Sequence, residues 1–308
     1  MLTTKNRVGI RPAGILIVGM AWWLSGCTPA GPRALLDGER LLGQGRFEQA
    51  AQRLEAAVQL LPDNPQAWNH LGLAYHRAGR LEDATRAYEQ ALALDREQTS
   101  ARFNLGCLDL ERGDVTGAIR ELTAYVLVQP DSTAGWLKLG TAQLRAGQTD
   151  AAEQSFRQAL KIDAGAAEGL NGLGLVQVQR RRYPEAYQHF QAAVRAQPDY
   201  APALRNAAVV AHQFLKNKPV ALRNYQELLS LSNVSDRLTV QSLATRLQNE
   251  LHPPPVQPEP TQPAQTEKPT VAPVDDDKTS DRSGRQSPTP GRRSEERRVG
   301  KECRSRWS

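Results

Sequence analysis

The sequence has little of the chemistry that enzymes and metal sites need. It contains 5 histidines and 3 cysteines in 308 residues. His70 and His76 lie six positions apart, not the three or four that would bring two imidazoles together on a helix. No glycine-rich loop follows a strand pattern, and no nucleophile motif has acid and base partners in order. We therefore expect a protein that is not an enzyme and has no catalytic residue, no metal, no cofactor and no small-molecule substrate.

The apolar run near the N-terminus is short. It covers residues 13–24, and 12 residues at 1.5 Å each cannot cross a hydrocarbon core of about 30 Å. Three basic residues precede the run, as they do in a secretory signal segment. We therefore expect a targeting segment here rather than a membrane span.

The run ends in Leu24-Ser25-Gly26-Cys27, which resembles a bacterial lipobox. This resemblance implies that residues 1–26 are removed as a lipoprotein signal peptide and that Cys27 is lipidated. Residues 27–33 then form a short lipidated tether. Thr28 follows the cysteine, where the lipoprotein family places aspartate as a signal for the inner membrane. The resemblance therefore implies a cell-envelope protein on the periplasmic face of the outer membrane.

The composition changes sharply near the C-terminus. Ten of the 20 prolines fall within residues 252–292, where large apolar residues are nearly absent. Such a segment cannot build a core, so we expect a disordered, proline-rich tail. Residues 293–308 resemble the translation of a sequencing adapter, and we exclude them from functional reasoning. If they are foreign, the native C-terminus lies beyond residue 292.

The net charge of +6 is concentrated at the ends of the chain. The signal segment carries three basic residues, and residues 293–308 carry three more basic than acidic residues. Residues 27–292 are therefore close to neutral, which gives no electrostatic argument for nucleic-acid binding. Between these two terminal segments and apart from Cys27, the remaining cysteine is Cys107, which we expect to be a small apolar filler.

Repetition is the strongest pattern in the sequence. Glycines at positions 38, 72, 106, 140 and 174 are spaced 34 residues apart. Trp68, Leu71, Gly72 and Tyr75 form one helical stripe, Gly79 ends that helix, and a second helix follows. The small Ala84 on this second helix is expected to allow close approach to Gly72. A helix pair repeated at this period must stack on its neighbours to bury both faces.

This pattern resembles the tetratricopeptide repeat (TPR) family. The resemblance implies an all-α, right-handed superhelical solenoid over residues 34–251. The expected repeats are 31–64, 65–98, 99–132, 133–166, 167–200 and 201–234, followed by a capping helix over 235–251. The third repeat departs from the pattern most at Arg102 and Asp109, and Arg181 replaces a turn glycine. In the sixth repeat the second helix lies one position late, which predicts a longer turn.

The resemblance also implies a concave groove lined by the first helix of each pair. An apolar floor edged by amides and cations can hold an extended peptide, with asparagines pairing to its backbone and cations meeting a carboxylate. Asn69 and Asn171 sit one position away from Asn104 and Asn206, which is irregular for a clamp. The candidate groove residues are Asn69, His70, Leu73, His76, Arg77, Phe103, Asn104, Leu110, Lys138, Leu144, Arg145, Asn171, Leu175, Arg205 and Asn206.

Two functions fit these features. The first is a lipid-anchored scaffold that recruits protein or peptide partners, similar to pilot lipoproteins of type IV pili or to outer-membrane adaptors of peptidoglycan enzymes. The second is the docking region of a longer TPR-containing enzyme, such as a glycosyltransferase, whose catalytic domain follows residue 292. A purely structural spacer is a third reading. We favour the scaffold.

Overall fold

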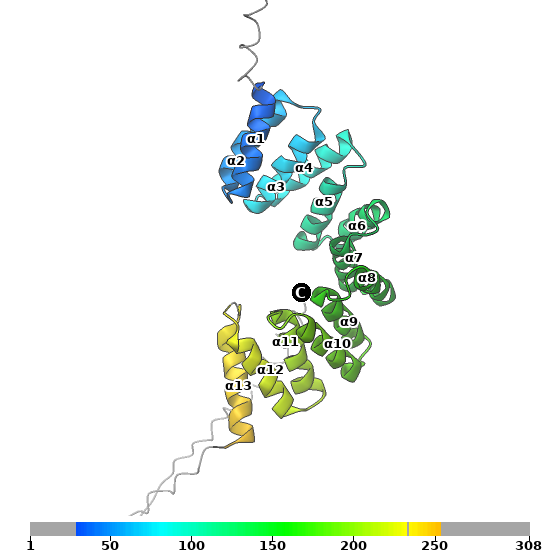
Figure 1. The fold of residues 1–308 in the computed structure, drawn as a ribbon, viewed down its shortest axis with the longest axis vertical. Helices are drawn as coiled ribbons and strands as arrows, with labels where there is room; N and C mark the ends of the chain where they lie inside the picture. The colour runs from blue at the N-terminus through cyan, green and yellow to red at the C-terminus, as the bar shows by residue number, and fades with distance from the viewer. Residues whose placement is uncertain (1–28, 233, 254–308) are drawn as a thin grey trace, which may run out of the picture. The chain divides into compact units, whose positions relative to one another are not determined.

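The computed structural model describes residues 29–232 and 234–253 (Figure 1). The expected signal peptide, the lipidated Cys27, the proline-rich tail and residues 293–308 lie outside the described residues. Within them every regular element is a helix. None of the described helices is long and apolar enough to cross a membrane. The chain divides between Asn206 and Ala207 into two compact units.

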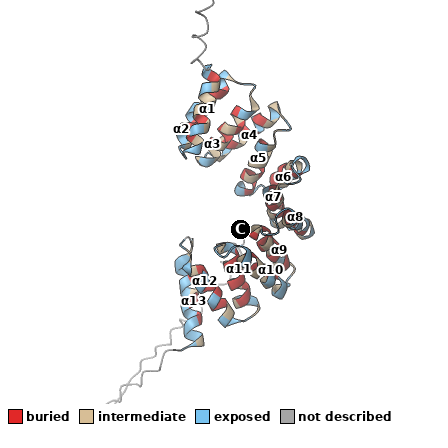
Figure 2. Cartoon of the chain, in the orientation of Figure 1, coloured by how far each residue is buried: buried red, intermediate tan, exposed pale blue. Residues whose placement is uncertain are grey.

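The first unit is a stack of five helix pairs, which confirms the all-α solenoid expectation. First helices are followed by second helices, and each second helix packs on the first helix of the next pair. The helices are α1 (Ala30–Gly43), α2 (Phe47–Leu60), α3 (Pro65–Arg77), α4 (Leu81–Leu94), α5 (Thr99–Arg112), α6 (Val115–Val128), α7 (Thr133–Arg145), α8 (Thr149–Ile162), α9 (Ala167–Gln179) and α10 (Tyr183–Ala196). Figure 2 shows the buried residues where these helices face one another.

Local chemistry sets where the helices begin and end. The Asn64 side chain accepts a hydrogen bond from the Ala67 amide at 3.0 Å and caps α3, with Pro65 at the first helical position. The turn between first and second helices needs one residue in the left-handed region, and glycine supplies it at Gly79 with φ of 79°. In the fifth pair Arg181 holds this place with φ of 61°. The packing of the neighbouring helices therefore holds an arginine in a backbone conformation that favours glycine.

Within each pair, the repeated glycine lies against a large side chain. A Cβ atom at Gly72 would come within 2.6 Å of the Tyr88 ring, and Gly140 stands in the same relation to Phe156. The side chain that packs into the space beside Gly72 is therefore Tyr88, which lies four positions after Ala84. Ala84 is itself buried in a cluster with Tyr88 and Leu105.

The third pair replaces a tryptophan by an arginine and keeps the same hydrogen bond. Trp68 Nε1 donates to the Pro62 carbonyl at 2.8 Å, and Trp136 Nε1 donates to the Pro130 carbonyl at 2.7 Å. Arg102 stands 34 residues after Trp68 and donates to a carbonyl six residues earlier, as both tryptophans do. It also pairs with the buried Glu121 at 3.2 Å. Arg102 therefore replaces the indole donor.

The sixth pair contains the extra residue that the sequence predicts. α11 (Ala201–Val209) continues into a π-helical turn, η1 (Val210–Phe214), before α12 (Lys218–Ser230). The left-handed turn residue is Lys216, 35 residues after Arg181 rather than 34. A π-helical turn holds one more residue than an α-helical one. The insertion is thus absorbed at the end of the first helix.

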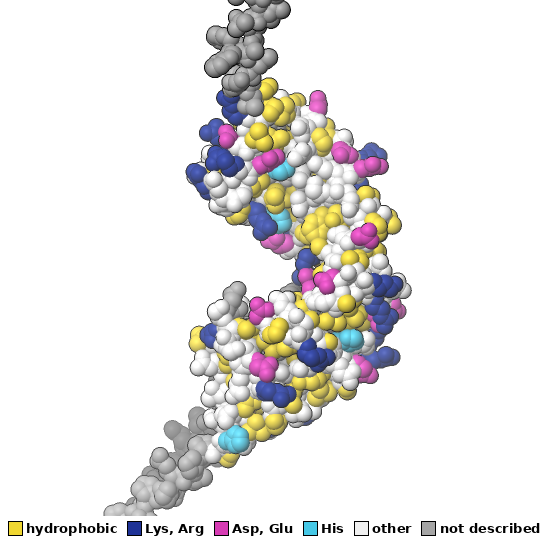
Figure 3. Space-filling model, viewed as in Figure 1, with side chains coloured by type: hydrophobic (Ala, Val, Ile, Leu, Met, Phe, Trp, Pro, Cys, Tyr) yellow, Lys and Arg dark blue, Asp and Glu magenta, His cyan; other side chains and the backbone are white. Residues whose placement is uncertain are grey.

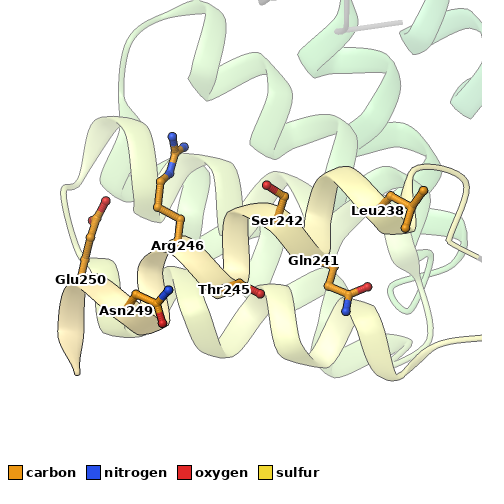
Figure 4. Close-up of a pocket in the computed structure, with 7 residues that line it drawn as sticks. All are labelled: Leu238, Gln241, Ser242, Thr245, Arg246, Asn249 and Glu250. Atoms are coloured by element: carbon orange, nitrogen blue, oxygen red, sulfur yellow. The ribbon is translucent and has the colours of Figure 1, made fainter. Parts of the chain in front are cut away.

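In the second unit, α13 (Arg237–Leu251) packs on α12. It buries Val240, Ala244 and Leu247. Its opposite face is mostly polar and lines a surface depression formed by Leu238, Gln241, Ser242, Thr245, Arg246, Asn249 and Glu250 (Figure 4). One apolar face and one polar face are what a capping helix needs.

Candidate partner-binding face

The predicted groove residues lie on a surface formed by consecutive first helices. α1, α3, α5, α7 and α9 contact one another in this order. Because the repeat is regular, a given repeat position lies beside the same or the next position on the neighbouring first helix. We call the surface formed by α1, α3, α5, α7 and α9 the first-helix face.

Two pairs of predicted groove asparagines bind each other instead of lining an open ladder. Asn104 Nδ2 donates to Asn69 Oδ1 at 3.1 Å, and Asn206 Nδ2 donates to Asn171 Oδ1 at 2.9 Å. Both pairs span 35 residues, one repeat plus one position. Asn69 and Asn171 are buried, with 6% and 7% of their surfaces exposed. The expectation that these two amides face a peptide backbone is corrected: they join neighbouring first helices.

A second row of hydrogen bonds with the same spacing lies at the C-terminal ends of the first helices. Arg145 Nη1 donates to the Leu110 carbonyl at 2.8 Å, and Gln179 Nε2 donates to the Leu144 carbonyl at 3.0 Å. The last carbonyls of a helix have no partner inside the helix, and here each accepts from a side chain in addition to the amide of the following turn glycine, Gly113 or Gly147. Leu110 is 6% exposed, which corrects its assignment to the groove floor.

Most other charges on this face are paired. His76 Nε2 lies 2.8 Å from Glu111, and Lys138 Nζ lies 2.8 Å from Glu168. His70 Nε2 lies 3.6 Å from Glu39. Burial lowers the pKa of His70, and the Glu39 charge opposes that shift. Lys138 and Glu168 therefore cancel in charge, whereas Glu39 keeps its negative charge beside a His70 that burial favours in the neutral form.

Four partners on the face were missed by sequence reasoning: Glu39, Ser100, Glu168 and Gln179. Ser100 Oγ lies 3.4 Å from Asn69 Nδ2, with Asn69 as the donor. The relevant signal is the separation of residues. Gln179 lies 35 residues after Leu144, the same separation as in the asparagine pairs, so this partner follows from the period. Glu39, Ser100 and Glu168 lie 30 or 31 residues from their partners and do not follow that rule.

Comparison with known proteins decides the family. A family model described as the C-terminal domain of cilia and flagella-associated protein 70, a TPR domain, matches residues 31–233. The chain belongs to this TPR family. Comparison with curated protein sequences gave no match.

Solved TPR structures share the fold at low sequence identity. A structure of PilF from Pseudomonas aeruginosa is 19% identical, with a TM-score of 0.57, and the match covers 72% of this chain and 97% of that one. MamA from Desulfovibrio magneticus is 19% identical, with a TM-score of 0.53 and coverage of 57% and 99%. YrrB, described as a TPR protein with an unusual peptide-binding site, is 20% identical, with a TM-score of 0.51 and coverage of 56% and 89%. At these identities the likeness establishes the fold alone.

The apolar side chains on the TPR first-helix face remain partly accessible. Leu73, Phe103, Leu144 and Leu175 are each of intermediate burial. The Phe103 ring is tilted against Tyr125, with centroids 5.0 Å apart. One such side chain lies on each of α3, α5, α7 and α9.

Cys107 lies on the same face and is half-buried. Burial raises the pKa of its thiol to about 11, although Lys138 opposes the shift. The thiol is therefore neutral at physiological pH, and a neutral thiol is a poor nucleophile and metal ligand. Within the described ranges, no three His, Cys, Asp or Glu side chains are grouped as metal ligands.

Two cations on this TPR face are exposed and unneutralised. Arg77 and Arg145 occupy the same repeat position in the second and fourth repeats, at the ends of α3 and α7. Among the described residues, no carboxylate forms an ion pair with either side chain, and Arg145 binds a neutral carbonyl. Arg205 and Asn206 continue the candidate set on α11, and both are half-buried. The first-helix face thus combines partly exposed apolar side chains with two exposed arginines.

Proposed function

We propose that this TPR protein is a non-enzymatic scaffold that binds partner proteins or extended peptides on its first-helix face. The observation that carries the proposal is the partial exposure of Leu73, Phe103, Leu144 and Leu175 on the first helices that also carry the exposed Arg77 and Arg145. Apolar side chains bury well against an extended segment, and an arginine fork suits a carboxylate. Nucleic acid is not among the expected partners.

The charges favour an acidic partner. Glu168 is neutralised by Lys138, and among the described residues neither Glu39 nor Glu111 forms an ion pair with Arg77 or Arg145. Arg77 and Arg145 keep their charge, so a carboxylate side chain or a C-terminal carboxylate can neutralise them. The description of YrrB as a peptide-binding TPR protein supports this class of ligand for the fold.

We further propose that the scaffold works at a membrane of the bacterial cell envelope. The lipobox-like Leu24–Cys27 motif supports lipidation of Cys27 and attachment to the periplasmic face of the outer membrane. A role in envelope assembly follows, either as a pilotin or as an adaptor for peptidoglycan enzymes. The fold likeness to PilF is compatible with the first role.

Charge reversal tests partner binding on the first-helix face. The double variant Arg77→Glu, Arg145→Glu should capture much less of the envelope proteins or acidic peptides that the wild-type protein captures in an affinity experiment. The matched control is Arg195→Glu with Arg223→Glu, two exposed arginines on the second helices α10 and α12 that change the net charge equally. Thermal unfolding of each variant verifies folding. Equal capture by both double variants would remove the first-helix face as the binding surface.

The anchor has its own test. Cys27→Ala should abolish labelling of the protein by a fatty-acid probe. The variant should also move from the membrane fraction to the soluble fraction. Retained labelling would show that another residue carries the lipid. The outcome is independent of partner capture, so the two parts of the proposal can fail separately.

A further inference from the structure

The first repeat carries charges at positions that later repeats bury. Ala67, Leu71, Ala74 and Ala87 are at most 2% exposed and belong to the core that packs against the first pair. The residues 34 positions earlier are Arg33, Asp37, Arg40 and Arg53. No repeat precedes this pair among the described residues, so the same positions of α1 and α2 face solvent. A helix-pair array needs a polar surface at such an end.

This end surface is basic as well as polar. Arg40, Arg46 and Arg53 line one depression between α1 and α2, together with Asp37 and the amides Gln49 and Gln52. Arg33 lies one helical turn before Asp37 on α1. We call Arg33, Asp37, Arg40, Arg46 and Arg53 the basic cap face. Figure 3 shows basic side chains gathered over α1 and α2.

Arg40 is paired within the cap face, whereas Arg46 and Arg53 meet no carboxylate among the described residues. Arg40 Nη2 lies 3.4 Å from Asp37, and both side chains are well exposed. Arg46 binds the neutral amides of Gln44 and Gln49. Within the described part of the chain, no carboxylate forms an ion pair with Arg46 or Arg53. Arg46 and Arg53 therefore leave this face positive.

Solubility alone does not explain this excess of positive charge. The exposed face of α13 solves the same problem with Gln241, Ser242, Thr245 and Asn249, and its Arg246 and Glu250 balance in charge. Neutral amides and hydroxyls therefore suffice for a capping surface in this protein. A patch of one sign instead matches a partner of the opposite sign.

We propose that the basic cap face contacts anionic lipid headgroups. α1 begins at Ala30, three residues after Cys27, so an anchor at Cys27 would hold the α1–α2 hairpin at the membrane surface. α1 has 14 residues, about 21 Å at 1.5 Å per residue. Arg33 lies near its start and Arg46 beyond its end. The basic cap face would then lie against the membrane, with α3 packed on the other side of the hairpin.

The strength of such a contact can be bounded. A basic side chain near an anionic membrane strengthens binding about fivefold, and the effect falls off within a Debye length of about 8 Å at physiological salt. Arg46 and Arg53 can therefore bias the orientation of an already anchored protein, although they would anchor it weakly by themselves. The inference draws on the proposed attachment through the N-terminal segment, but not on the identity of any protein partner.

Arginine footprinting of the full-length chain tests the inference. The protein is reconstituted into vesicles of phosphatidylcholine alone or of an equimolar mixture with phosphatidylglycerol, and it is treated with phenylglyoxal. Mass spectrometry gives the modification rate of each arginine. Arg46 and Arg53 should react several-fold more slowly on the anionic vesicles, and high salt should restore their rates. Arg195 and Arg223 should react equally on both vesicle types.

A double variant completes the test. Arg46→Glu with Arg53→Glu should remove the protection of Arg33 and Arg40 on anionic vesicles, whereas Arg195→Glu with Arg223→Glu should leave it intact. Equal rates for Arg46 and Arg53 on neutral and anionic vesicles would overturn the proposal. Because any chain held in the vesicle by its N-terminal segment can be footprinted, this result is separate from fatty-acid labelling of Cys27 and from partner capture.

Discussion

Asn104 and Asn69 join neighbouring first helices through one amide–amide hydrogen bond of 3.1 Å, made between repeat positions that differ by one. Asn171 and Asn206 repeat this relationship three repeats later. The one-residue offset between the asparagines, which looks irregular for a ligand clamp, is the geometry of a contact between repeats. Adjacent first helices are displaced along their axes, so residues 35 apart come side by side.

We expect this contact to stabilise the array. Asn69→Ala should lower the free energy of unfolding by about 1 to 2 kcal/mol, because it leaves the Asn104 amide without its acceptor. In a double-mutant cycle with Asn104→Ala, the coupling energy should be about 0.5 to 1.5 kcal/mol, measured by urea unfolding. A cycle between Asn104 and the distant Asn171 should show no coupling. Zero coupling in the first cycle would mean that the bond contributes nothing to stability.

A second prediction concerns the glycine packed against Tyr88. Gly72→Ala should lower the free energy of unfolding by about 1 to 3 kcal/mol, because its Cβ would lie 2.6 Å from the ring. Gly43 is the control: it ends α1 and has nothing within 4 Å of an added Cβ. Gly43→Ala should raise stability by about 0.5 kcal/mol. Similar destabilisation by both substitutions would refute the role of close packing at Gly72.

A third prediction concerns the left-handed turn at Arg181. A non-glycine residue in this region costs about 1 kcal/mol, which glycine avoids. Arg181→Gly should therefore raise the midpoint of urea unfolding. The reciprocal change, Gly147→Arg, places arginine at the same turn of the preceding repeat, where φ is 74°, and should lower stability by a similar amount. Loss of stability in Arg181→Gly would show that the arginine makes a compensating interaction.

A fourth prediction concerns the pH dependence of stability. Asp109 is 6% exposed, and its pKa is raised from 3.8 to about 6, mainly by burial and secondly by Asp114. Since the folded state binds this proton more tightly than the unfolded state, its contribution to stability is present below about pH 4 and is lost as the pH rises to about 6. Asp109→Asn should stabilise the protein by about 1 to 2 kcal/mol at neutral pH.

The same variant should flatten the stability profile between those two pH values. Chemical unfolding across this range, compared with the wild type, measures both effects. Asp114→Asn keeps an N-cap residue for α6 and removes only the smaller cause of the shift, so it should have a weaker effect. An unchanged slope in Asp109→Asn would assign the titration in this range to other groups.

Most of the fold could be predicted from the sequence because a 34-residue period repeats local signals many times. Trp68 marks a helix face, Gly72 a close contact and Gly79 a turn. A different residue at one of these positions in one repeat does not hide the pattern. Arg181 and Arg102 show this directly. Arg181 adopts the left-handed conformation of the glycine it replaces. Arg102 donates to the same carbonyl position as the tryptophan it replaces. In both cases the neighbouring repeats hold the backbone in the regular arrangement.

The candidate site was less predictable. The sequence placed Asn69, Leu110 and Asn171 on the correct helices, but it could not show that neighbouring helices bury them. Arg77 and Lys138 look alike in the sequence, yet Lys138 meets Glu168 while Arg77 keeps its charge.

The sequence by itself thus determined the helices, their pairing and the phase of every repeat, because these depend on periodic contacts between residues at fixed separations. Only the tertiary structure decided which side chains on the repeated positions remain available to a partner. That depends on the axial displacement between neighbouring helices, which sets the partner of each polar group and leaves no trace in a single repeat.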